Sequence, residues 1–534
     1  MDPSRTIPIL IGITGHRRIR KEDHDALYLA VKTELKKLQT EYPSSGIVML
    51  SSLAEGGDLL CADAGEELGI PLLAALPMPG EEYEKDFSEA AKEKFRKHCA
   101  RAEEVFIAPY TEKVPEGGAD RDFLFRQAGI YVASHSHILI ALWDGGPGTE
   151  AACGTAEAVG FALYGDYSPS SGISLRTDKN AEVWHIFTPR GEYTQEEAGT
   201  VHVLGDHEAM RRILADTDEF NRKADKVQTG TKSRLPEKNT DDRGLDRLEQ
   251  ISLIAGKLSS RYAALYKRIL AALAAAGMLL AFAFLMYDEV QAIWMIFICG
   301  IMLIFAWVIA RFASRSDCHR RYIEYRALAE CLRVQLYLRY AGTGIQAADL
   351  LTWTQQEETA WIRDAVSALS AGAAPARSHD IRICWVEEQR KYHQWAGKRS
   401  IRDLRVSENV VRAALALSAL LYCAAVIFEL FFGGLYLEPV VSVPDVEIWR
   451  TGLKISLGTI SVVTLFVAGF YGKQSLPRGS SDHRKMERFY SRVYDRLTQQ
   501  GQTEELLTTL AREELTENGN WCSYQRDNTP DINI

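Results

Sequence analysis

Short apolar runs alternate with helical patterns along the first 190 residues of the chain. The apolar runs, which we expect to form strands, cover residues 7–13, 47–52, 71–76, 104–108, 137–143 and 181–187. The helical patterns between them cover residues 25–39, 58–68, 83–101, 122–133 and 155–163. This alternation predicts an α/β fold with a Rossmann-like parallel sheet, and near-continuous apolar strands fit burial on both faces.

Glycine-rich turns follow three of the predicted strands. Because the carboxyl ends of parallel strands meet at one edge of a sheet, the three turns are expected to form one ligand-binding crevice. Glycines there let a phosphate or ribose approach the backbone, and a helix start supplies N–H groups at its positive end. We predict that the ligand contacts Gly12, Thr14, Gly15, His16, Arg17, Arg18, Ser52, Leu53, Ala54, Glu55, Gly56, Gly57, Asp58, Trp143, Asp144, Gly145, Gly146, Gly154, Thr155 and Glu157.

Several of these side chains have two readings. The arginines Arg17 and Arg18 either bind a phosphate or lie on a solvated loop. Asp58 either caps its helix or binds a ribose hydroxyl. Glu55 would repel a phosphate, so it faces a ribose or base or points away, and Trp143 is either a packed indole or a surface for stacking a base.

The next segment, residues 191–268, has the composition of a charged connector. Residues 191–205 are polar and loop-like, 208–226 form a charged helical pattern, and 229–243 form a linker rich in Lys, Asp and Thr. From Leu245 a longer helical pattern runs into the first of four apolar blocks. A continuous helix there would carry movement from the α/β domain to the following region.

Four apolar blocks cover residues 269–287, 292–310, 413–437 and 455–472. Their lengths approach or exceed the roughly 20 residues that a bilayer core requires, so we predict four transmembrane helices in two hairpins, 269–312 and 413–472. The first block has a small-residue face suited to close helix packing, formed by Ala271, Ala275, Ala276 and Gly277. The rest of this all-α region comprises a cytosolic helical segment, 313–412, and a cytosolic helical tail, 473–534.

Lysines and arginines flank the outer sides of both hairpins, whereas the turns inside them are acidic or mixed. This distribution places both termini and the 313–412 segment in the cytoplasm, as expected for a multi-pass protein of the inner cell membrane. Glu429 is the only charged residue inside the four apolar blocks. It lies about 25 Å along its helix from Arg412. It is either a helix-end carboxylate that reaches the interface or a charge at a pore mouth.

Composition narrows the partners. A formal net charge of −9 gives no support to nucleic-acid binding, which needs a basic domain or stripe. The nine cysteines show no zinc-type spacing, and Met1–Pro8 shows no secretory signal, so we expect no metal, no cofactor and a cytosolic α/β domain. The first turn lacks the third glycine of the dinucleotide fingerprint, which disfavours hydride transfer with NAD.

The series Gly12-Ile13-Thr14-Gly15-His16-Arg17, Leu53-Ala54-Glu55-Gly56-Gly57-Asp58 and Ala141-Leu142-Trp143-Asp144-Gly145 resembles the SLOG superfamily over roughly the first 190 residues. That superfamily includes DprA, the Lonely Guy phosphoribohydrolases and the sensor domains of TRPM channels. The resemblance implies that a nucleotide or nucleotide-derived signal binds at the carboxyl edge of the sheet.

The chain departs from the Lonely Guy pattern at its catalytic positions. Residues 145–149 imitate the Gly-Gly-x-Gly-Thr core, yet Ala152 stands at the position of the motif's glutamate. Starting from Gly154-Thr155 instead puts Glu157 one residue early. A binding domain is therefore favoured over a hydrolase.

The segment from Tyr325 to Arg333, together with Trp385, Gln389 and Tyr392, is similar to SLATT-type membrane effectors. The two resemblances imply a homo-oligomeric effector that binds a nucleotide-derived second messenger, such as an ADP-ribose derivative or a cyclic nucleotide. They also imply that it permeabilises the inner membrane in antiviral defence, beside a synthase of the signal. The alternatives are a membrane-tethered nucleotide hydrolase or phosphoribohydrolase and, less favoured, a regulated transporter.

Overall fold

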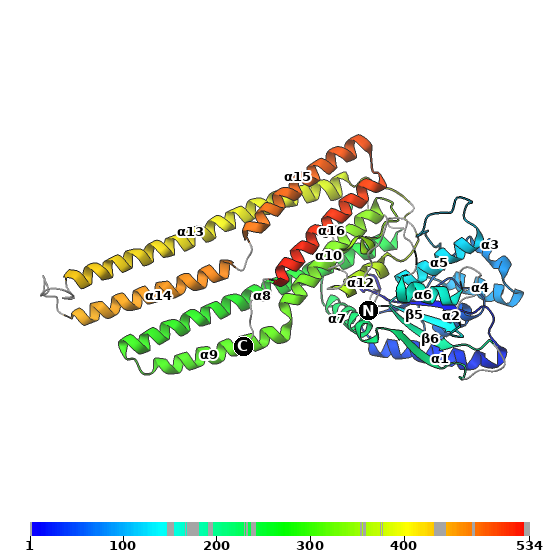
Figure 1. Ribbon diagram of the computed structural model, residues 1–534, viewed down its shortest axis with the longest axis horizontal. Coiled ribbons are helices and arrows are strands. Elements are labelled where there is room, and N and C mark those ends of the chain that lie inside the picture. Colours follow the sequence, from blue (N-terminus) through cyan, green and yellow to red (C-terminus); the bar gives the residue numbers. More distant parts are fainter. Residues whose placement is uncertain are drawn as a thin grey trace. The chain divides into compact units, whose positions relative to one another are not determined.

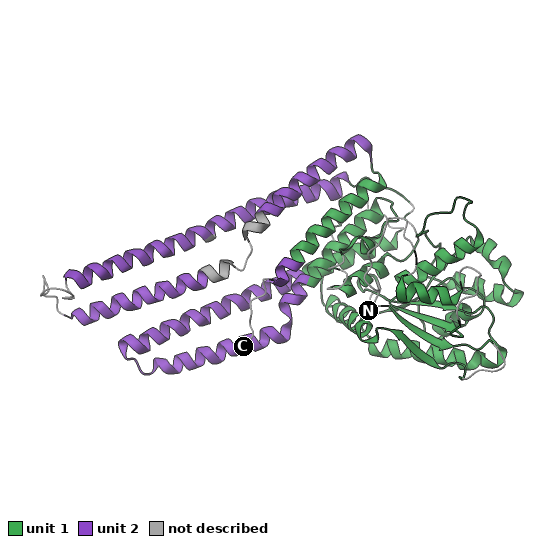
Figure 2. Cartoon of the chain, in the orientation of Figure 1, with its two compact units in different colours: residues 1–258, 324–381, 502–522 green, residues 259–323, 382–501, 523–534 purple. Residues whose placement is uncertain are grey.

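The computed structural model divides the chain into two compact units (Figure 2). Unit 1 comprises residues 1–258, 324–381 and 502–522, and unit 2 comprises residues 259–323, 382–501 and 523–534. The residues that the structure describes are 3–146, 154–165, 167, 181–190, 196–228, 230, 233–236, 242–352, 355, 359–373, 375, 377–431, 445–472 and 476–527.

Unit 1 is built on a β-sheet surrounded by helices (Figure 1). The sheet has seven strands in the order β4-β3-β2-β1-β5-β6-β7. The strands are β1 (Ile9–Gly15), β2 (Ile47–Ser51), β3 (Leu72–Leu76), β4 (Glu104–Ile107), β5 (Ile138–Trp143), β6 (Glu182–Phe187) and β7 (Val201–Gly205). The first six are parallel, with Ile11 paired to Met49 of β2 and to Ile138 of β5, and β7 runs antiparallel to β6. The predicted α/β fold with a mostly parallel sheet is confirmed.

Helices connect the strands. They are α1 (His24–Glu41), α2 (Gly57–Glu67), α3 (Gly80–Tyr83), α4 (Glu89–Arg101), α5 (Arg121–His135), α6 (Thr155–Tyr164) and α7 (His207–Ala224), with short 3₁₀ turns at Pro3–Arg5, Lys21–Asp23 and Glu84–Asp86. Local chemistry sets several starts, because Ser88, Asp120 and Asp206 each accept a hydrogen bond from a backbone N–H three residues on. The cap at Ser88 also explains why the single helix predicted over 83–101 is divided.

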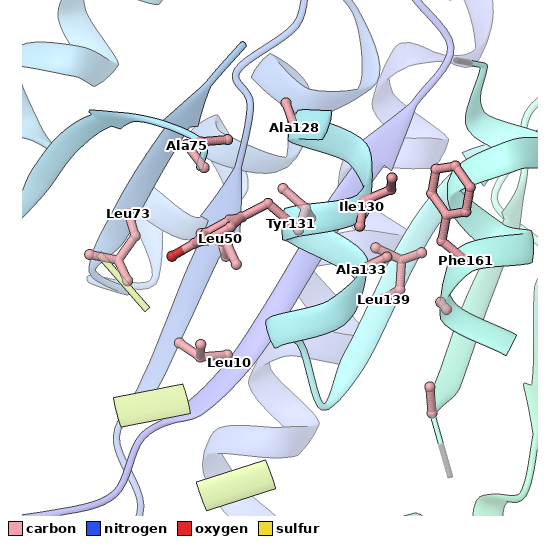
Figure 3. Close-up of a cluster of buried hydrophobic side chains, with 14 of the residues drawn as sticks. Leu10, Leu50, Leu73, Ala75, Ala128, Ile130, Tyr131, Ala133, Leu139 and Phe161 are labelled. Atoms are coloured by element: carbon pink, nitrogen blue, oxygen red, sulfur yellow. The ribbon is translucent and has the colours of Figure 1, made fainter. Parts of the chain in front are cut away.

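One face of the sheet is covered by α5 and α6. Leu10, Leu50 and Leu139 of the strands pack there against Tyr131 of α5 and Phe161 of α6 (Figure 3). Alternate residues of each strand point to the opposite face of the sheet, which other helices cover. There, Gly65 of α2 lies against the Met49 side chain of β2. Burial on both faces accounts for the near-continuous apolar strands.

The strand β7 falls within residues 191–205, which the sequence predicts to be a loop. It lies at the edge of the sheet, and none of its five residues is fully buried. An edge strand is short and only partly buried, so its sequence pattern is weaker than that of the central strands. The predicted linker at 229–243 and the Gly-x-Gly-Thr imitation through Gly148, Thr149 and Ala152 lie largely outside the described residues.

Unit 1 also includes segments far along the chain. They are the first part of α8 (Arg243–Val290), most of α10 (Cys318–Tyr340), the 3₁₀ turn η4 (Ala347–Leu350), α12 (Ala360–Ser370) and most of α16 (Glu504–Asp527). Ala368 of α12 belongs to the same buried cluster as the strand residues of the sheet, and Ala371 and Ala373 pack against it. The α/β domain predicted to end at residue 190 is therefore part of a larger unit that is discontinuous in the sequence.

Unit 2 contains the remainder of α8, α9 (Met295–Ser316), the π-helical turn η5 (Arg382–Glu387), α13 (Glu388–Phe431), α14 (Val446–Gly472) and α15 (Leu476–Gln500). Four helical stretches are long and apolar enough to cross a membrane, namely Arg243–Val290, Met295–Tyr340, Arg382–Phe431 and Val446–Val467. Large apolar side chains such as Phe297, Leu420 and Leu465 are about 70 % exposed on them (71 %, 68 % and 72 %), as lipid contact requires. The four membrane-spanning-capable helices are thus confirmed by length and composition.

The helices of unit 2 pack closely at glycines. A Cβ atom on Gly277 of α8 would lie 2.4 Å from the Phe466 ring of α14, and one on Gly458 would lie 2.9 Å from Leu285. The small-residue face predicted for the first span therefore receives a bulky side chain at Gly277. Glu429 of α13 forms a bidentate ion pair with Arg450 of α14, at 2.6 and 2.9 Å, which is the arrangement expected of a helix-end carboxylate.

Candidate functional site

A cavity of about 760 Å³ opens at the carboxyl ends of β1 and β2 in unit 1. Its volume lies in the range typical of small-molecule sites, and its position is the one that open α/β sheets use for ligands. The lining comes from the β1–α1 loop, the β2–α2 turn, α5, the start of α6 and the segment after β6. Ten of the predicted contacts line it, namely Thr14, Gly15, His16, Arg17, Arg18, Ser52, Ala54, Asp58, Gly154 and Thr155.

The paired glycines Gly56 and Gly57 allow the β2–α2 turn to pack directly against the backbone of the β1–α1 loop. A Cβ on Gly57 would lie 2.8 Å from the Gly15 Cα, and one on Gly56, whose φ is +96°, would lie 2.4 Å from the His16 carbonyl oxygen. The N–H of Gly57 donates to that same carbonyl of His16 at 2.9 Å. The Gly57 N–H therefore holds the turn itself.

The buried carboxyl group of Asp58 lines the cavity. Only 3 % of the residue is exposed, and it accepts a hydrogen bond from the Ser51 hydroxyl at 3.0 Å. Burial raises the pKa of Asp58 to about 7, against the opposing effects of Ser51 and the Ala54 and Gly15 N–H groups. Asp58 makes no side-chain cap of α2, so the capping reading does not hold. The carboxyl group is instead placed to titrate near neutral pH.

A histidine links the ends of β1, β5 and β6. The His16 Nδ1 atom lies 2.7 Å from an Arg190 guanidinium nitrogen, and its Nε2 lies 3.2 Å from an Asp144 carboxylate oxygen. A guanidinium only donates, so Nδ1 accepts from Arg190, and the Asp144 backbone N–H donates to Nε2 at 3.0 Å. Burial and then the charge of Arg190 lower the pKa of His16. The contact at Nδ1 holds Arg190 at the cavity.

Two arginines at the cavity form no ion pair with other described residues, although the charge of Arg17 lowers the pKa of the nearby Asp58. The exposed side chains of Arg17 and Arg18 have no ion-pair partner in the part of the chain that the structure describes. The Arg17 guanidinium stacks over the Phe125 ring at 5.0 Å, a cation–π contact. Arg190, whose side chain is about half exposed (54 %), adds a third cation beside Asp144. An anionic ligand with a planar group fits this combination of guanidinium and aromatic side chains.

The start of α6 also faces the cavity, through Gly154 and Thr155. One turn further on, Glu157 forms an ion pair with Arg126 of α5, and Arg126 also binds Glu112 at 2.8 Å. Glu157 does not line the cavity among the described residues, and its carboxylate is neutralised. Glu157 is therefore not placed to act as a catalytic acid or base on a ligand in this cavity.

The remaining predicted contacts are not among the described residues that line the cavity. Glu55 accepts hydrogen bonds from Ser88 at the start of α4, so it points away, and Trp143 packs against His185 with ring centres 5.1 Å apart. Asp144 acts through His16, as described above. The predicted contacts that do not line the cavity are Gly12, Leu53, Glu55, Gly56, Gly57, Trp143, Asp144, Gly145, Gly146 and Glu157.

Sequence reasoning missed the part of the cavity that comes from helix interiors and from the end of β6. Asp122 lies in the first turn of α5, Phe125 and Gly129 lie further along the same helix, where no motif marks them, and Tyr83 lies at the end of α3. Arg190 follows a buried strand directly, and that position was the one available signal.

One group of metal-type side chains lies elsewhere in unit 1, where Asp63, Glu66 and His98 approach within 4.8 Å of one another. Lys94 and Lys97 already bind the two carboxylates at 2.6 and 2.7 Å. A hydrogen bond from His98 and the charge of Lys94 outweigh the effect of burial and lower the pKa of Asp63 to about 2. These ion pairs join α2 to α4, and the group needs no metal for neutrality.

The chain matches no family model and no curated protein. The fold and the cavity nevertheless define a class: an α/β unit with a ligand-sized cavity, in one chain with four helices able to span a membrane.

Proposed function

We propose that this protein is a ligand-gated membrane effector. An anionic, nucleotide-derived second messenger, such as an ADP-ribose derivative or a cyclic nucleotide, binds the cavity of unit 1. The bound ligand then favours an arrangement of a homo-oligomer in which the membrane is permeable. The resemblance of this sequence to SLOG and SLATT proteins supports a role in antiviral defence at the inner membrane, beside a synthase of the signal.

The observation that carries the proposal is the pair of unneutralised cations at the cavity. Arg17 and Arg18 are exposed at the carboxyl edge of the sheet, next to Phe125 and the start of α6. Phosphate oxygens would complete the hydrogen bonds of the guanidinium groups, and a base or ribose would lie on the apolar side formed by α5.

The helix α5 connects this cavity with the segment that lies between the two hairpins in the sequence. Phe125 and Val132 line the cavity, whereas Tyr131 and His135 of the same helix bind Gly372 and Gln346. A ligand that moves α5 therefore acts on residues 324–381, which continue into α13 of unit 2. A change from mostly closed to mostly open requires roughly 5 kcal/mol of differential affinity, which several charged contacts supply.

The test uses full-length protein in dye-loaded vesicles. We expect addition of an ADP-ribose derivative or a cyclic nucleotide to release the dye at the concentrations that saturate binding. Vesicles that stay tight at saturating ligand, over all protein densities, would reject the effector function. Chromatographic recovery of a free base or ribose phosphate from the same samples would favour the alternative, a membrane-tethered hydrolase.

A further inference from the structure

Charges at the two ends of the membrane-spanning helices are arranged differently. Lys454 of α14 binds Glu289 of α8 at 3.1 Å, so the turn ends of both hairpins lie at the same end of unit 2. Besides Lys454, Arg450 is the only Lys or Arg within 269–310 and 413–472, and it binds Glu429 and Glu447. Both cations at the turn end are thus neutralised by carboxylates of the protein.

The opposite end carries exposed cations that the protein does not neutralise. These side chains, here called the cationic collar, have no ion-pair partner among the described residues: Lys267 and Arg268 of α8, Arg311 and Arg315 of α9, and Arg405 of α13. They contrast with Arg412 of α13, which binds Glu408 at 3.1 Å.

The collar residues lie at comparable heights along the hairpins. At 1.5 Å per residue, Arg268 lies about 33 Å from the end of α8 at Val290, and Arg315 lies about 30 Å from the start of α9 at Met295. Arg405 precedes the apolar part of α13 by about 12 Å. The polar headgroup layer adds roughly 5–8 Å to each side of the hydrocarbon core. Long arginine and lysine side chains at these heights reach that layer.

We propose that the cationic collar binds the phosphate groups of anionic phospholipids at the membrane face predicted to be cytoplasmic. The occupant follows from charge complementarity, because exposed cations directly continuous with apolar helices attract anionic headgroups. This lipid selectivity goes beyond the proposed function and does not depend on the nucleotide ligand. Arg311 and Arg315 are one helical turn apart, so they hold headgroups on a single face of α9.

The experiment measures lipid selectivity of full-length protein in phosphatidylcholine vesicles. Spin-labelled phosphatidylglycerol or spin-labelled phosphatidylcholine is added in trace amounts, and electron paramagnetic resonance reports the fraction of each label that the protein immobilises. We expect preferential immobilisation of phosphatidylglycerol, weakening as salt is raised. The variants Arg311→Gln/Arg315→Gln and Arg405→Gln should lower the relative affinity, by up to about fivefold for each cation that reaches a headgroup.

A matched control removes two exposed cations from the far end of α15, Arg492 and Arg496, which also lack ion-pair partners in the described chain. Arg492→Gln/Arg496→Gln should leave the selectivity unchanged, and Arg311→Lys/Arg315→Lys should retain it. Equal immobilisation of the two lipids by the wild-type protein overturns the proposal. So does a loss in the α15 variant as large as the loss in the collar variants, or a loss in the Lys variant equal to that in the Gln variant.

Discussion

The hydroxyl group of Tyr131 binds the backbone of Gly372 twice, donating to its carbonyl oxygen at 3.3 Å and accepting from its N–H at 3.0 Å. These two residues are 241 positions apart, and the membrane-spanning hairpin 269–312 lies between them in the sequence. Tyr131 also stacks on His135, whose ring lies 2.8 Å from the Gln346 side-chain nitrogen. The cavity helix is thus bonded directly to the segment that leads to the second hairpin.

The first prediction concerns coupling. Tyr131→Phe keeps the aromatic ring but removes both hydrogen bonds to Gly372, leaving two buried backbone groups unpaired. We expect ligand affinity within about twofold of wild type, a loss of roughly 1–3 kcal/mol in the free energy of unfolding and a severalfold fall in ligand-triggered dye release. Calorimetry, thermal denaturation and vesicle leakage measure the three quantities, below the melting temperature of the variant.

Tyr164→Phe is the control for this experiment, because Tyr164 is 71 % exposed at the end of α6. It should change none of the three quantities. Full leakage in Tyr131→Phe, at unchanged binding, would remove the α5 contact from the coupling route.

The second prediction concerns the unneutralised arginines. Replacing Arg17 or Arg18 by Gln should weaken binding of a phosphorylated ligand about 10- to 100-fold, since a charged hydrogen bond contributes roughly 1.5–3 kcal/mol. Titration calorimetry with full-length protein in detergent tests this, and the salt dependence of the affinity should decrease in each variant. Lys36→Gln, which removes an exposed cation from α1, is the charge-matched control. Unchanged affinity in both arginine variants would place the anion elsewhere.

The third prediction concerns pH. The Asp58 pKa is about 7 in the folded protein and 3.8 as a model value, so between these pH values the folded state binds a proton that the unfolded state has released. Stability should therefore fall as pH rises from about 4 to 7, by roughly 4 kcal/mol from this group. Asp58→Asn should flatten that dependence and raise the melting temperature at neutral pH.

Melting temperature against pH for wild type, Asp58→Asn and Asp25→Asn provides the measurement. Asp25 is fully exposed on α1, so its variant should retain the wild-type slope. A slope that persists in Asp58→Asn would assign the pH dependence to other groups.

The fourth prediction concerns catalysis. Because Glu157 is bound by Arg126 outside the cavity lining, a saturating ligand should be recovered intact after overnight incubation with the protein. Glu157→Gln should leave binding within about twofold and should change only stability, by about 1 kcal/mol or less for a partly exposed ion pair. Ligand breakdown that disappears in Glu157→Gln would establish the hydrolase instead.

The strands of the sheet were predictable because their runs are buried on both faces, as at Ile138–Trp143. The edge strand β7 was not, because half-exposure removes the apolar signal. Within the site, the glycine turns and the arginines directly follow predicted strands, so their place at the sheet edge could be predicted. Phe125 of α5 lines the cavity through tertiary packing, which no local sequence pattern signals.

Unit 1 is built from segments that lie before, between and after the two hairpins in the sequence, and this order has a consequence for biosynthesis. Its sheet is translated first, but Ala368 in the sheet's own core and Leu507 and Leu510 of α16 leave the ribosome after the first and second hairpins, respectively. The domain that holds the cavity is therefore completed only once the membrane segments have been made. Part of the core of unit 1 therefore stays exposed on the nascent chain until both hairpins have been translated, so synthesis of the membrane segments and completion of the ligand-binding unit are coupled in time.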